Sequence, residues 1–462
     1  MVIYILAYSY AFISAFLLIL AIQLSKKASG DLKKLLVIWF VFGFIFNFYS
    51  FSWYYTVYPL VWLPPGVLQL VGIFVAHLIL SLVAAIPYLV GSIIFLEEAR
   101  ELPRFVRPLF FGATLAFAEV FRSIFISTLF KGEGTDISFH YISGALGNAL
   151  SMTPLVEFAY WGGTYALSFL FGILIYIIVE WRTFRIYVPY LFILTGLYSF
   201  LHFFVPTFGP NHPTTIGVVT TSFPDVPDSE LNASFKTRLP LLLSIANGFS
   251  SSTSVIVYPE DTRLISHLNK AELMLLHKRF PNTLFLDGDT LTLNNKLTNV
   301  SVFSSPDTET ISLRSKSFLL PFNEYMPYFF SYLLPFFLPS SDMKGYEEKH
   351  TYIPVQSGNV YQFRDLRIST LLCSEVISYE ILEKIKQENP SLVFFQSRLQ
   401  VFHDNPWFWM HLYMFSKTAA AELRRPIIGS ADGAPSVIVS PHGDIVRILP
   451  TGIATTSIEY PF

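Results

Sequence analysis

The sequence has almost no cysteine and little charge. Cys373 is the single cysteine in 462 residues, so no internal disulfide can form. Charged residues make up 14% of the chain, whereas hydrophobic residues make up 52% and aromatic residues 17%. Such an apolar composition is untypical of a soluble protein and indicates membrane-spanning segments. The formal net charge of -2 argues against nucleic acid as a partner.

Several familiar catalytic and metal-binding patterns are missing as well. The ten histidines show no spacing such as H-E-x-x-H, and one cysteine cannot form C-x-x-C. No glycine-rich phosphate loop follows an apolar run, and G-x-S-x-G does not occur. We therefore expect neither a metal nor a cofactor. Asn232-Ala-Ser and Asn299-Val-Ser match the N-glycosylation pattern, but this match is common by chance.

Apolar runs fill residues 1–206, which we expect to form a transmembrane bundle of about six helices. Each run reaches the ~20 residues that a helix needs to cross the hydrocarbon core. The expected spans are Val2–Leu24, Leu35–Tyr58, Gly66–Leu96, Pro108–Phe130, Leu155–Glu180 and Ile186–Val205.

Basic residues are concentrated in alternate loops between these spans. They are Lys26, Lys27, Lys33 and Lys34 in the first loop, Arg100, Arg104 and Arg107 in the third, and Arg182 and Arg185 in the fifth. The positive-inside rule assigns these loops to the cytoplasm. The N-terminus and everything after the sixth span are then expected on the outer face. Within the spans, Glu119 and Arg122 have the i,i+3 spacing of an ion pair. For this pair and for Glu157, a structural role and a headgroup-binding role are both open.

The composition changes after about residue 212. Short β-rich runs such as SVIVYPE and RISTLLCSE alternate with helical patterns at Ser229–Asn247, Ala271–Phe280, Ser378–Asn389 and Trp409–Arg424. Strands alternating with helices predict one α/β domain over residues 212–455.

Three stretches of this domain carry reactive side chains. Cys373 follows the apolar run of a predicted strand, Glu260 ends the run VIVYPE, and Lys316 precedes an apolar segment. A carboxylate near apolar walls suits a general base, and a fixed ammonium favours a thiolate and an oxyanion. Singly, each has an ordinary interpretation: a buried small hydrophobe, a loop and a solvated lysine. The ordered set of Glu, Lys and Cys along one segment is the specific observation.

The text around the three residues resembles the nitrilase superfamily, and most closely its membrane-bound branch, the apolipoprotein N-acyltransferases. YPE at 258–260 is similar to the family's Trp-Pro-Glu, and LLCSE at 371–375 corresponds to its Cys-Tyr-Glu. KSFLLPFNEYMP at 316–327 is close to the family's Lys-x-x-Leu-Val-Pro-Phe-Gly-Glu-Tyr-x-Pro and is the most specific of the three. PLVEFAYWGGTYALSFL at 154–170, with its paired glycines, also resembles the family's membrane segment.

The resemblance implies a nitrilase-like four-layer αββα sandwich with Glu260 as general base, Lys316 stabilising the oxyanion and Cys373 as nucleophile. Glu324 and Glu375 would support them, although a structural role for these two is equally open. The implied reaction moves an acyl chain from a phospholipid, through a thioester on Cys373, to the N-terminal α-amine of a diacylglyceryl-cysteine lipoprotein. The implied partners are the phospholipid donor, the apolipoprotein acceptor and the membrane, and we expect a monomer. The implied location is the inner membrane of a bacterium, with the catalytic domain on the periplasmic face.

An apolar arm at 317–339 follows the lysine. Three prolines interrupt it and prevent a regular spanning helix. We expect it to dip into the membrane interface and to guide an acyl chain, with Phe329, Phe330, Phe336 and Phe337 providing the apolar surface. A buried loop is the alternative.

The sequence departs from the family in several places. Ser374 stands where the family usually has tyrosine, and residues 396–409 replace its Ser-Asn-Asp-x-Trp-Phe-Gly loop. Six spans are expected where the family typically has eight. These departures leave two alternatives, a membrane-anchored nitrilase-type amidase or hydrolase, and an acyltransferase with a different acceptor. A non-catalytic scaffold is disfavoured because all three reactive residues are present.

Overall fold

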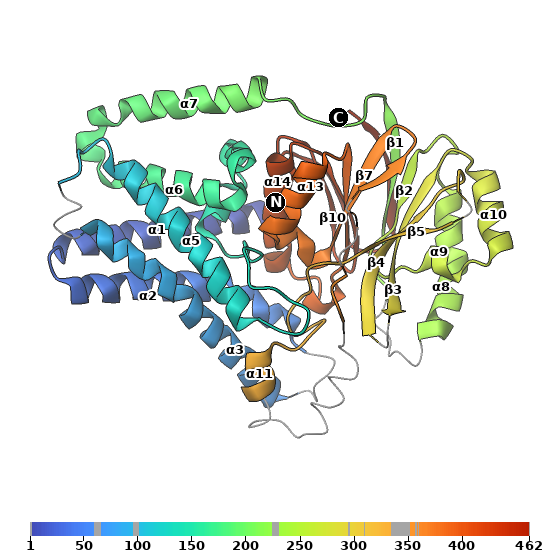
Figure 1. Cartoon of the computed structure of the whole chain (residues 1–462), viewed down its shortest axis with the longest axis horizontal. Coiled ribbons are helices and arrows are strands. Elements are labelled where there is room, and N and C mark those ends of the chain that lie inside the picture. Colours follow the sequence, from blue (N-terminus) through green and yellow to red (C-terminus); the bar gives the residue numbers. More distant parts are fainter. Residues whose placement is uncertain are drawn as a thin grey trace.

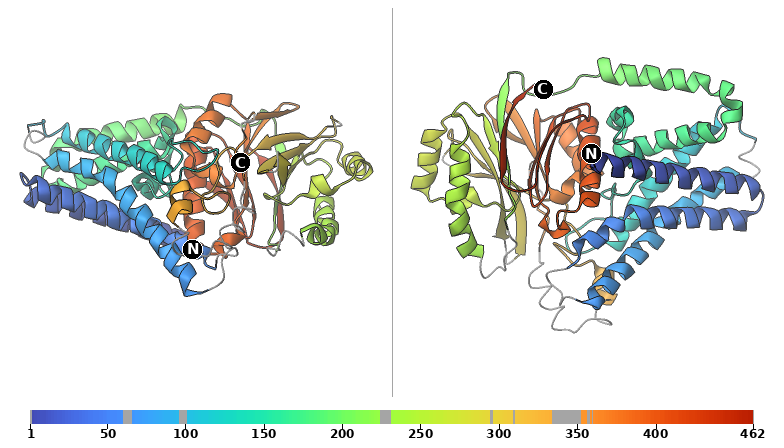
Figure 2. Two further views of the ribbon diagram at one scale, coloured as in Figure 1. Left: turned by 60° about the horizontal axis from the view of Figure 1, so that its bottom comes forward. Right: turned by 180° about the vertical axis from the view of Figure 1, so that it is seen from behind.

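The computed structural model describes residues 2–59, 66–95, 101–223, 231–293, 296–308, 310–333, 352–355, 358 and 360–461. The chain builds a helical part and a part with two β-sheets, which lie side by side (Figures 1 and 2). The N-terminal end of α1 lies at the end of the helical part that faces the sheets.

Several helices of the helical part are long and apolar enough to cross a membrane. Four segments have the length and hydropathy to cross a membrane: Val2–Lys27, Leu32–Val57, Gln69–Phe95 and Arg107–Leu129. Two shorter apolar helices follow, α6 (Gly163–Val179) and α7 (Val188–Phe203). The protein is therefore a membrane protein. The predicted fifth and sixth spans contain these two shorter helices, so their crossing of the membrane stays a prediction.

A buried ion pair lies inside the helical part, on α5 (Arg107–Leu129). Arg122 Nε donates to Glu119 Oε2 at 2.6 Å, and both side chains are fully buried. Glu119 Oε1 also accepts the Tyr88 hydroxyl at 2.5 Å and the Leu146 amide at 2.8 Å. The predicted Glu119–Arg122 pair is confirmed. The other hydrogen-bond partners of Glu119 are also protein groups, because a charge buried among helices needs partners there.

The second part contains two six-stranded sheets. The first has the order β12-β1-β2-β3-β4-β5, and the second has the order β11-β10-β9-β8-β7-β6. In each sheet three neighbouring strands are parallel, β1-β2-β3 in one and β7-β8-β9 in the other. The strands of the first sheet are β12 (Ala454–Tyr460), β1 (Thr214–Thr220), β2 (Val255–Val257), β3 (Leu284–Leu293), β4 (Lys296–Ser304) and β5 (Ser312–Ser315). Those of the second are β11 (Ile445–Leu449), β10 (Ser436–Val439), β9 (Ile427–Asp432), β8 (Leu392–Arg398), β7 (Leu366–Leu372) and β6 (Val360–Phe363).

Alternating side chains place the sheets face to face. On β2, Val255 and Val257 enter the core shared with Ile368 and Phe394 of the second sheet, whereas Ile256 faces away. The outer face of the first sheet is covered by α8 (Leu231–Asn247) and α10 (Lys270–Arg279). The outer face of the second is covered by α13 (Tyr379–Glu388) and α14 (Pro406–Leu423). The fold is the expected four-layer αββα sandwich, and β12 extends to Tyr460, beyond the predicted boundary at 455.

The membrane helices pack on the outer layer of the second sheet. Figure 1 shows α14 and α13 between the sheets and the helical part. One apolar cluster contains Leu80 of α3 (Val67–Ala85), Ile126 of α5 and Leu412 of α14. A second cluster joins α1 (Val2–Lys27) and α2 (Leu32–Ser50) to the same helix α14 through Met410 and Met414. The part with the two sheets is thus docked against the helical part by apolar contacts.

Candidate active site

Glu260 lies just past the carboxyl end of β2, a central strand paired in parallel with β1 and β3. The next residue, Asp261, has a left-handed φ of 62°, so the chain turns sharply there. The Glu260 side chain is buried, and its Oε2 accepts the backbone N–H of Arg398 at 3.2 Å. Because Arg398 ends β8 of the other sheet, this bond ties the glutamate to both sheets.

Lys316 follows β5 and lies between two carboxylates. Its Nζ is 2.8 Å from Glu324 Oε1 and 3.5 Å from Glu260 Oε1, and its side chain is buried. Glu324 belongs to a tight turn in which the Leu320 amide donates to Glu324 Oε2 at 2.6 Å. Lys316 and Glu324 are eight residues apart, and this turn folds the second back onto the first.

Cys373 comes directly after β7 and begins the short 3-10 helix η8 (Cys373–Ile377). Its φ of 44° lies in the left-handed region, which costs a non-glycine residue of order 1–3 kcal/mol. The residue is partly exposed. A strained turn at the end of a buried strand projects its side chain out of the sheet, which suits a nucleophile.

Glu375 holds this turn in place. Its carboxylate accepts the Leu372 amide at 2.8 Å, the Ser317 amide at 2.8 Å and the Ser317 hydroxyl at 3.0 Å. It also forms a fully buried ion pair with Arg314. Glu375 therefore holds the backbone just after Lys316 and just before Cys373, and it contacts the Arg314 side chain before Lys316.

Burial sets the protonation of the site. It raises the pKa of Glu260 to about 7, with Lys316 opposing the rise and Glu324 adding to it. Burial also raises the pKa of Cys373, again with Glu260 raising and Lys316 lowering it. Burial lowers the pKa of Lys316, but Glu260 and Glu324 more than reverse this and raise it above its usual value. The resting site is therefore a neutral thiol beside an ammonium, with a base that titrates near neutral pH.

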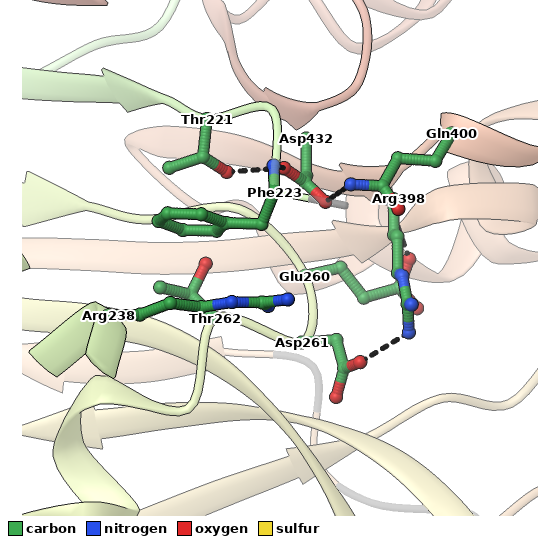
Figure 3. Close-up of a pocket in the computed structure, with 9 residues that line it drawn as sticks. All are labelled: Thr221, Phe223, Arg238, Glu260, Asp261, Thr262, Arg398, Gln400 and Asp432. Atoms are coloured by element: carbon green, nitrogen blue, oxygen red, sulfur yellow. Dashed lines mark hydrogen bonds and ion pairs between the residues drawn. The ribbon is translucent and has the colours of Figure 1, made fainter. Parts of the chain in front are cut away.

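A small polar cleft reaches Glu260 from the carboxyl ends of the parallel strands (Figure 3). Its walls are Thr221, Phe223, Arg238, Glu260, Asp261, Thr262, Arg398, Gln400 and Asp432. The enclosed volume is about 10 Å³, which is room for about one water molecule. Figure 3 shows the Arg398 side chain reaching Asp261, and the two form an ion pair at 2.5 Å.

An apolar surface meets the site at Cys373. Cys373 packs against a cluster that includes Phe318 and Phe330 of the arm together with Leu80 and Ile126 of the membrane helices. The Tyr325 hydroxyl donates to the Phe130 carbonyl at the end of α5 at 2.6 Å, which fastens the arm to the bundle. The thiol therefore lies at one end of a continuous apolar contact with the membrane domain.

The predicted arm residues divide into two kinds. Phe330 is buried and packs against Phe322, with ring centroids 4.7 Å apart. Phe329, its neighbour on α11 (Tyr328–Leu333), is 46% exposed. Phe336 and Phe337 lie outside the described residues.

The structure thus brings together all five predicted site residues, but sequence analysis missed two that complete the site. Asn299 on β4 donates from Nδ2 to Glu260 Oε1 at 3.2 Å and to Glu324 Oε1 at 2.7 Å. Arg314 pairs with Glu375. Asn299 was visible only as a glycosylation pattern, and Arg314 carried no signal except its place two residues before Lys316.

Comparison with known proteins agrees with the motifs. Residues 3–177 match the family model described as the apolipoprotein N-acyltransferase N-terminal domain. The resemblance to the apolipoprotein N-acyltransferases is confirmed. The match covers the membrane part of the chain, whereas the motifs around Glu260, Lys316 and Cys373 lie outside it. No curated protein matches the sequence.

Among solved structures, the chain is similar to three nitrilase-superfamily proteins at low identity. A branch 10 member from Saccharomyces cerevisiae has 14% identity and a TM-score of 0.41, covering 54% of this chain and 90% of that one. A CN-hydrolase superfamily protein from Xanthomonas campestris has 11% identity and a TM-score of 0.37, with coverages of 54% and 90%. An amidase from Nesterenkonia AN1 has 13% identity and a TM-score of 0.35, with coverages of 56% and 93%. At such scores, the fold assignment rests on the two sheets and their register.

Proposed function

We propose that the protein is an apolipoprotein N-acyltransferase-type enzyme. It transfers an acyl chain from a phospholipid, through a thioester on Cys373, to the N-terminal α-amine of a diacylglyceryl-cysteine lipoprotein. The observation that carries this proposal is the position of Cys373, whose pKa responds to the nearby charges of Glu260 and Lys316 and whose side chain packs on the apolar cluster shared with the membrane helices. The family match of residues 3–177 supports it.

In the first half-reaction, the Cys373 sulfur attacks the carbonyl carbon of the donor ester. Glu260 accepts the thiol proton as the C–S bond forms, because a free thiolate beside two carboxylates is disfavoured. The Lys316 ammonium stabilises the oxyanion. The C–O bond to glycerol then breaks, and Glu260 returns the proton to the leaving oxygen. The lysophospholipid departs and the acyl group remains on sulfur.

In the second half-reaction, the neutral α-amine of the lipoprotein attacks the thioester carbon. Glu260 accepts the proton that the nitrogen loses, and Lys316 again stabilises the oxyanion. The C–S bond breaks, the proton passes to the sulfur, and the amide leaves. Glu324 holds the Lys316 ammonium at 2.8 Å throughout.

The polar cleft favours one second candidate, a membrane-anchored hydrolase. The cleft next to Glu260 has room for about one water molecule, and water could attack the thioester in place of an amine. The product distinguishes the two reactions, since a hydrolase releases a free fatty acid and a transferase releases an N-acylated peptide.

The test is the intact mass of the purified protein after incubation with phospholipid vesicles. We expect a hydroxylamine-labile acyl adduct on the wild type and none on Cys373→Ala, because the chain has no other thiol. A diacylglyceryl-cysteine peptide added afterwards is expected to remove the adduct and gain its mass. A labile adduct on Cys373→Ala, or none on the wild type, would exclude the thioester mechanism.

A further inference from the structure

The two active-site carboxylates are joined by one amide that no motif around the site includes. Asn299 lies on β4, which pairs with β3 on one side and β5 on the other. Its Nδ2 donates to Glu260 Oε1 at 3.2 Å and to Glu324 Oε1 at 2.7 Å. These are the same two oxygens that approach the Lys316 ammonium, at 3.5 and 2.8 Å.

The side-chain amide of Asn299 also has a hydrogen-bond partner at its oxygen end. The Thr290 hydroxyl, opposite on β3, donates to Asn299 Oδ1 at 2.9 Å. Because ionised carboxylates only accept hydrogen bonds, the NH₂ group must face them, and Oδ1 then faces the Thr290 hydroxyl. The backbone carbonyl of Asn299 also accepts the backbone N–H of Lys316, at 2.7 Å. One residue therefore contacts the base, the second carboxylate and the backbone of the lysine.

We propose that Asn299 is a positioning residue of the acyl-transfer site, which holds Glu260 and Glu324 next to Lys316 and keeps Glu260 in its proton-accepting form. Two carboxylates near one ammonium leave an excess of negative charge, which favours protonation of one of them. A neutral amide that donates a hydrogen bond to each carboxylate stabilises the ionised forms without adding charge. The inference rests on the proposed function, because it concerns the base of that reaction.

This role also excludes glycosylation at Asn299. The Nδ2 atom that a glycan would occupy is bonded to both carboxylates in the active site. The serine of the N-x-S pattern at 299–301 has a structural role of its own. Ser301 is buried and donates to Gln396 Oε1 at 2.8 Å, between the sheets.

The test is the pH dependence of Cys373 acylation by a short-chain, water-soluble ester, followed by intact mass. Asn299→Leu removes both hydrogen bonds and is expected to shift the rising limb of the profile to higher pH by about one unit, as the loss of a hydrogen bond to a charged group requires. Asn299→Asp adds a third carboxylate and is expected to shift it further. Asn282→Asp, on an exposed loop where the side-chain oxygen accepts from Arg364, is the matched control and is expected to show no shift.

Thr290→Val keeps the test informative if Asn299→Leu does not fold. It releases the amide oxygen while leaving the NH₂ group in place, so a smaller shift in the same direction is expected. Slower acylation with an unchanged pH midpoint in these variants would overturn the inference and leave Asn299 as a structural residue. A wild type that forms no adduct would instead exclude the proposed function, so the two failures are distinct.

Discussion

At the scale of single residues, the site depends on charges that are buried together. Lys316 lies between Glu260 and Glu324, and the charges of all three act on the Cys373 thiol. A thiolate would add another negative charge to this buried group, so the thiol keeps its proton until attack. The consequence is that the protonation state of Glu260 limits acylation.

We predict that the rate of acylation rises with pH and levels off above about pH 7. The pKa of Glu260 is raised by burial to about 7. Below that pH the carboxyl is protonated and cannot accept the thiol proton, and above it the base is available. Acylation of Cys373 by a short-chain ester, measured by intact mass between pH 5 and 9, checks this.

Glu260→Gln is the control for that profile. It retains the shape of the side chain but removes the base, which is expected to slow acylation by roughly 10²–10⁴-fold. Its residual rate is expected to lack the rise near pH 7. A wild-type rate that stays flat from pH 5 to 9 would contradict the role of Glu260 as base.

At the scale of elements, the arm after Lys316 joins the active site to the membrane domain. Moving a long acyl chain through water costs ~0.8 kcal/mol per methylene, on the order of 10 kcal/mol in all. An apolar contact from the bundle to Cys373 avoids most of this cost. The arm is partly core and partly exposed, because Phe330 packs under Phe322 while Phe329 faces outward.

We predict that Phe329→Ser and Phe330→Ser have different effects. Phe329→Ser is expected to slow acylation of Cys373 by long-chain phospholipid several-fold with little effect on a short-chain ester, since only the membrane-bound donor needs the exposed ring. Phe330→Ser is expected to lower the unfolding free energy by roughly 3–5 kcal/mol, as large core truncations do, and to reduce activity with both donors.

Rates with the two donors and thermal unfolding in detergent distinguish these variants. The short-chain ester is the internal control, because it reaches the same thiol without the arm. If Phe329→Ser slows both donors equally, the exposed face of the arm has no part in handling lipid.

Residues 396–409, where the sequence departs from the family's loop, contact the membrane helices. Phe402 and Phe408 pack against Trp53 of η1 (Ser52–Val57), with centroid distances of 5.9 and 5.6 Å. Trp407 packs against Tyr49 at 5.4 Å. The segment after β8 therefore contributes aromatic side chains to the contact with the membrane helices.

At the scale of the whole molecule, a buried ion pair joins the two parts. Arg424, at the end of α14, donates to Glu157 Oε2 at 2.9 Å and to the Leu201 carbonyl of α7 at 2.6 Å. His202 and His442 also contact Glu157. Two histidines and a carboxylate could ligate a metal ion, but the Arg424 guanidinium already supplies the positive charge there.

We predict that Glu157→Ala weakens the docking of the sheets on the membrane part. The fully buried Arg424 would lose its carboxylate, a loss that typically costs roughly 3–5 kcal/mol. A lower unfolding temperature in detergent and faster proteolysis check this. Glu180→Ala is the control, because Glu180 pairs with Lys26 near the surface and such pairs contribute at most about 1 kcal/mol. Equal effects of the two variants would contradict the prediction.

The membrane topology of the whole chain is a further prediction. The basic loops assign the turn between α1 and α2 to the cytoplasm and the sheets to the outer face. In a Cys373→Ser background, cysteines at Ser29, in that turn, and at Met274, exposed on α10, are expected to react differently with a membrane-impermeant thiol reagent. Only the second is expected to react from outside intact cells, and equal labelling would contradict the assignment.

The sequence alone determined the apolar spans, the alternation of strands and helices, and the set of Glu260, Lys316 and Cys373. Each of these depends on periodicity or on short stretches of text, which are local properties of the chain. The Glu119–Arg122 pair belongs with them, because its partners are one helical turn apart.

Only the tertiary structure decided which side chains complete the site. Asn299 reaches Glu260 from 39 residues away, and Arg314 reaches Glu375 from 61 residues away. Phe329 and Phe330 are neighbours of the same residue type, yet the side chain of Phe329 is exposed and that of Phe330 is buried. The physical reason is that hydrogen-bond partners and burial depend on how the sheets, the arm and the membrane helices pack, and no local pattern records that packing.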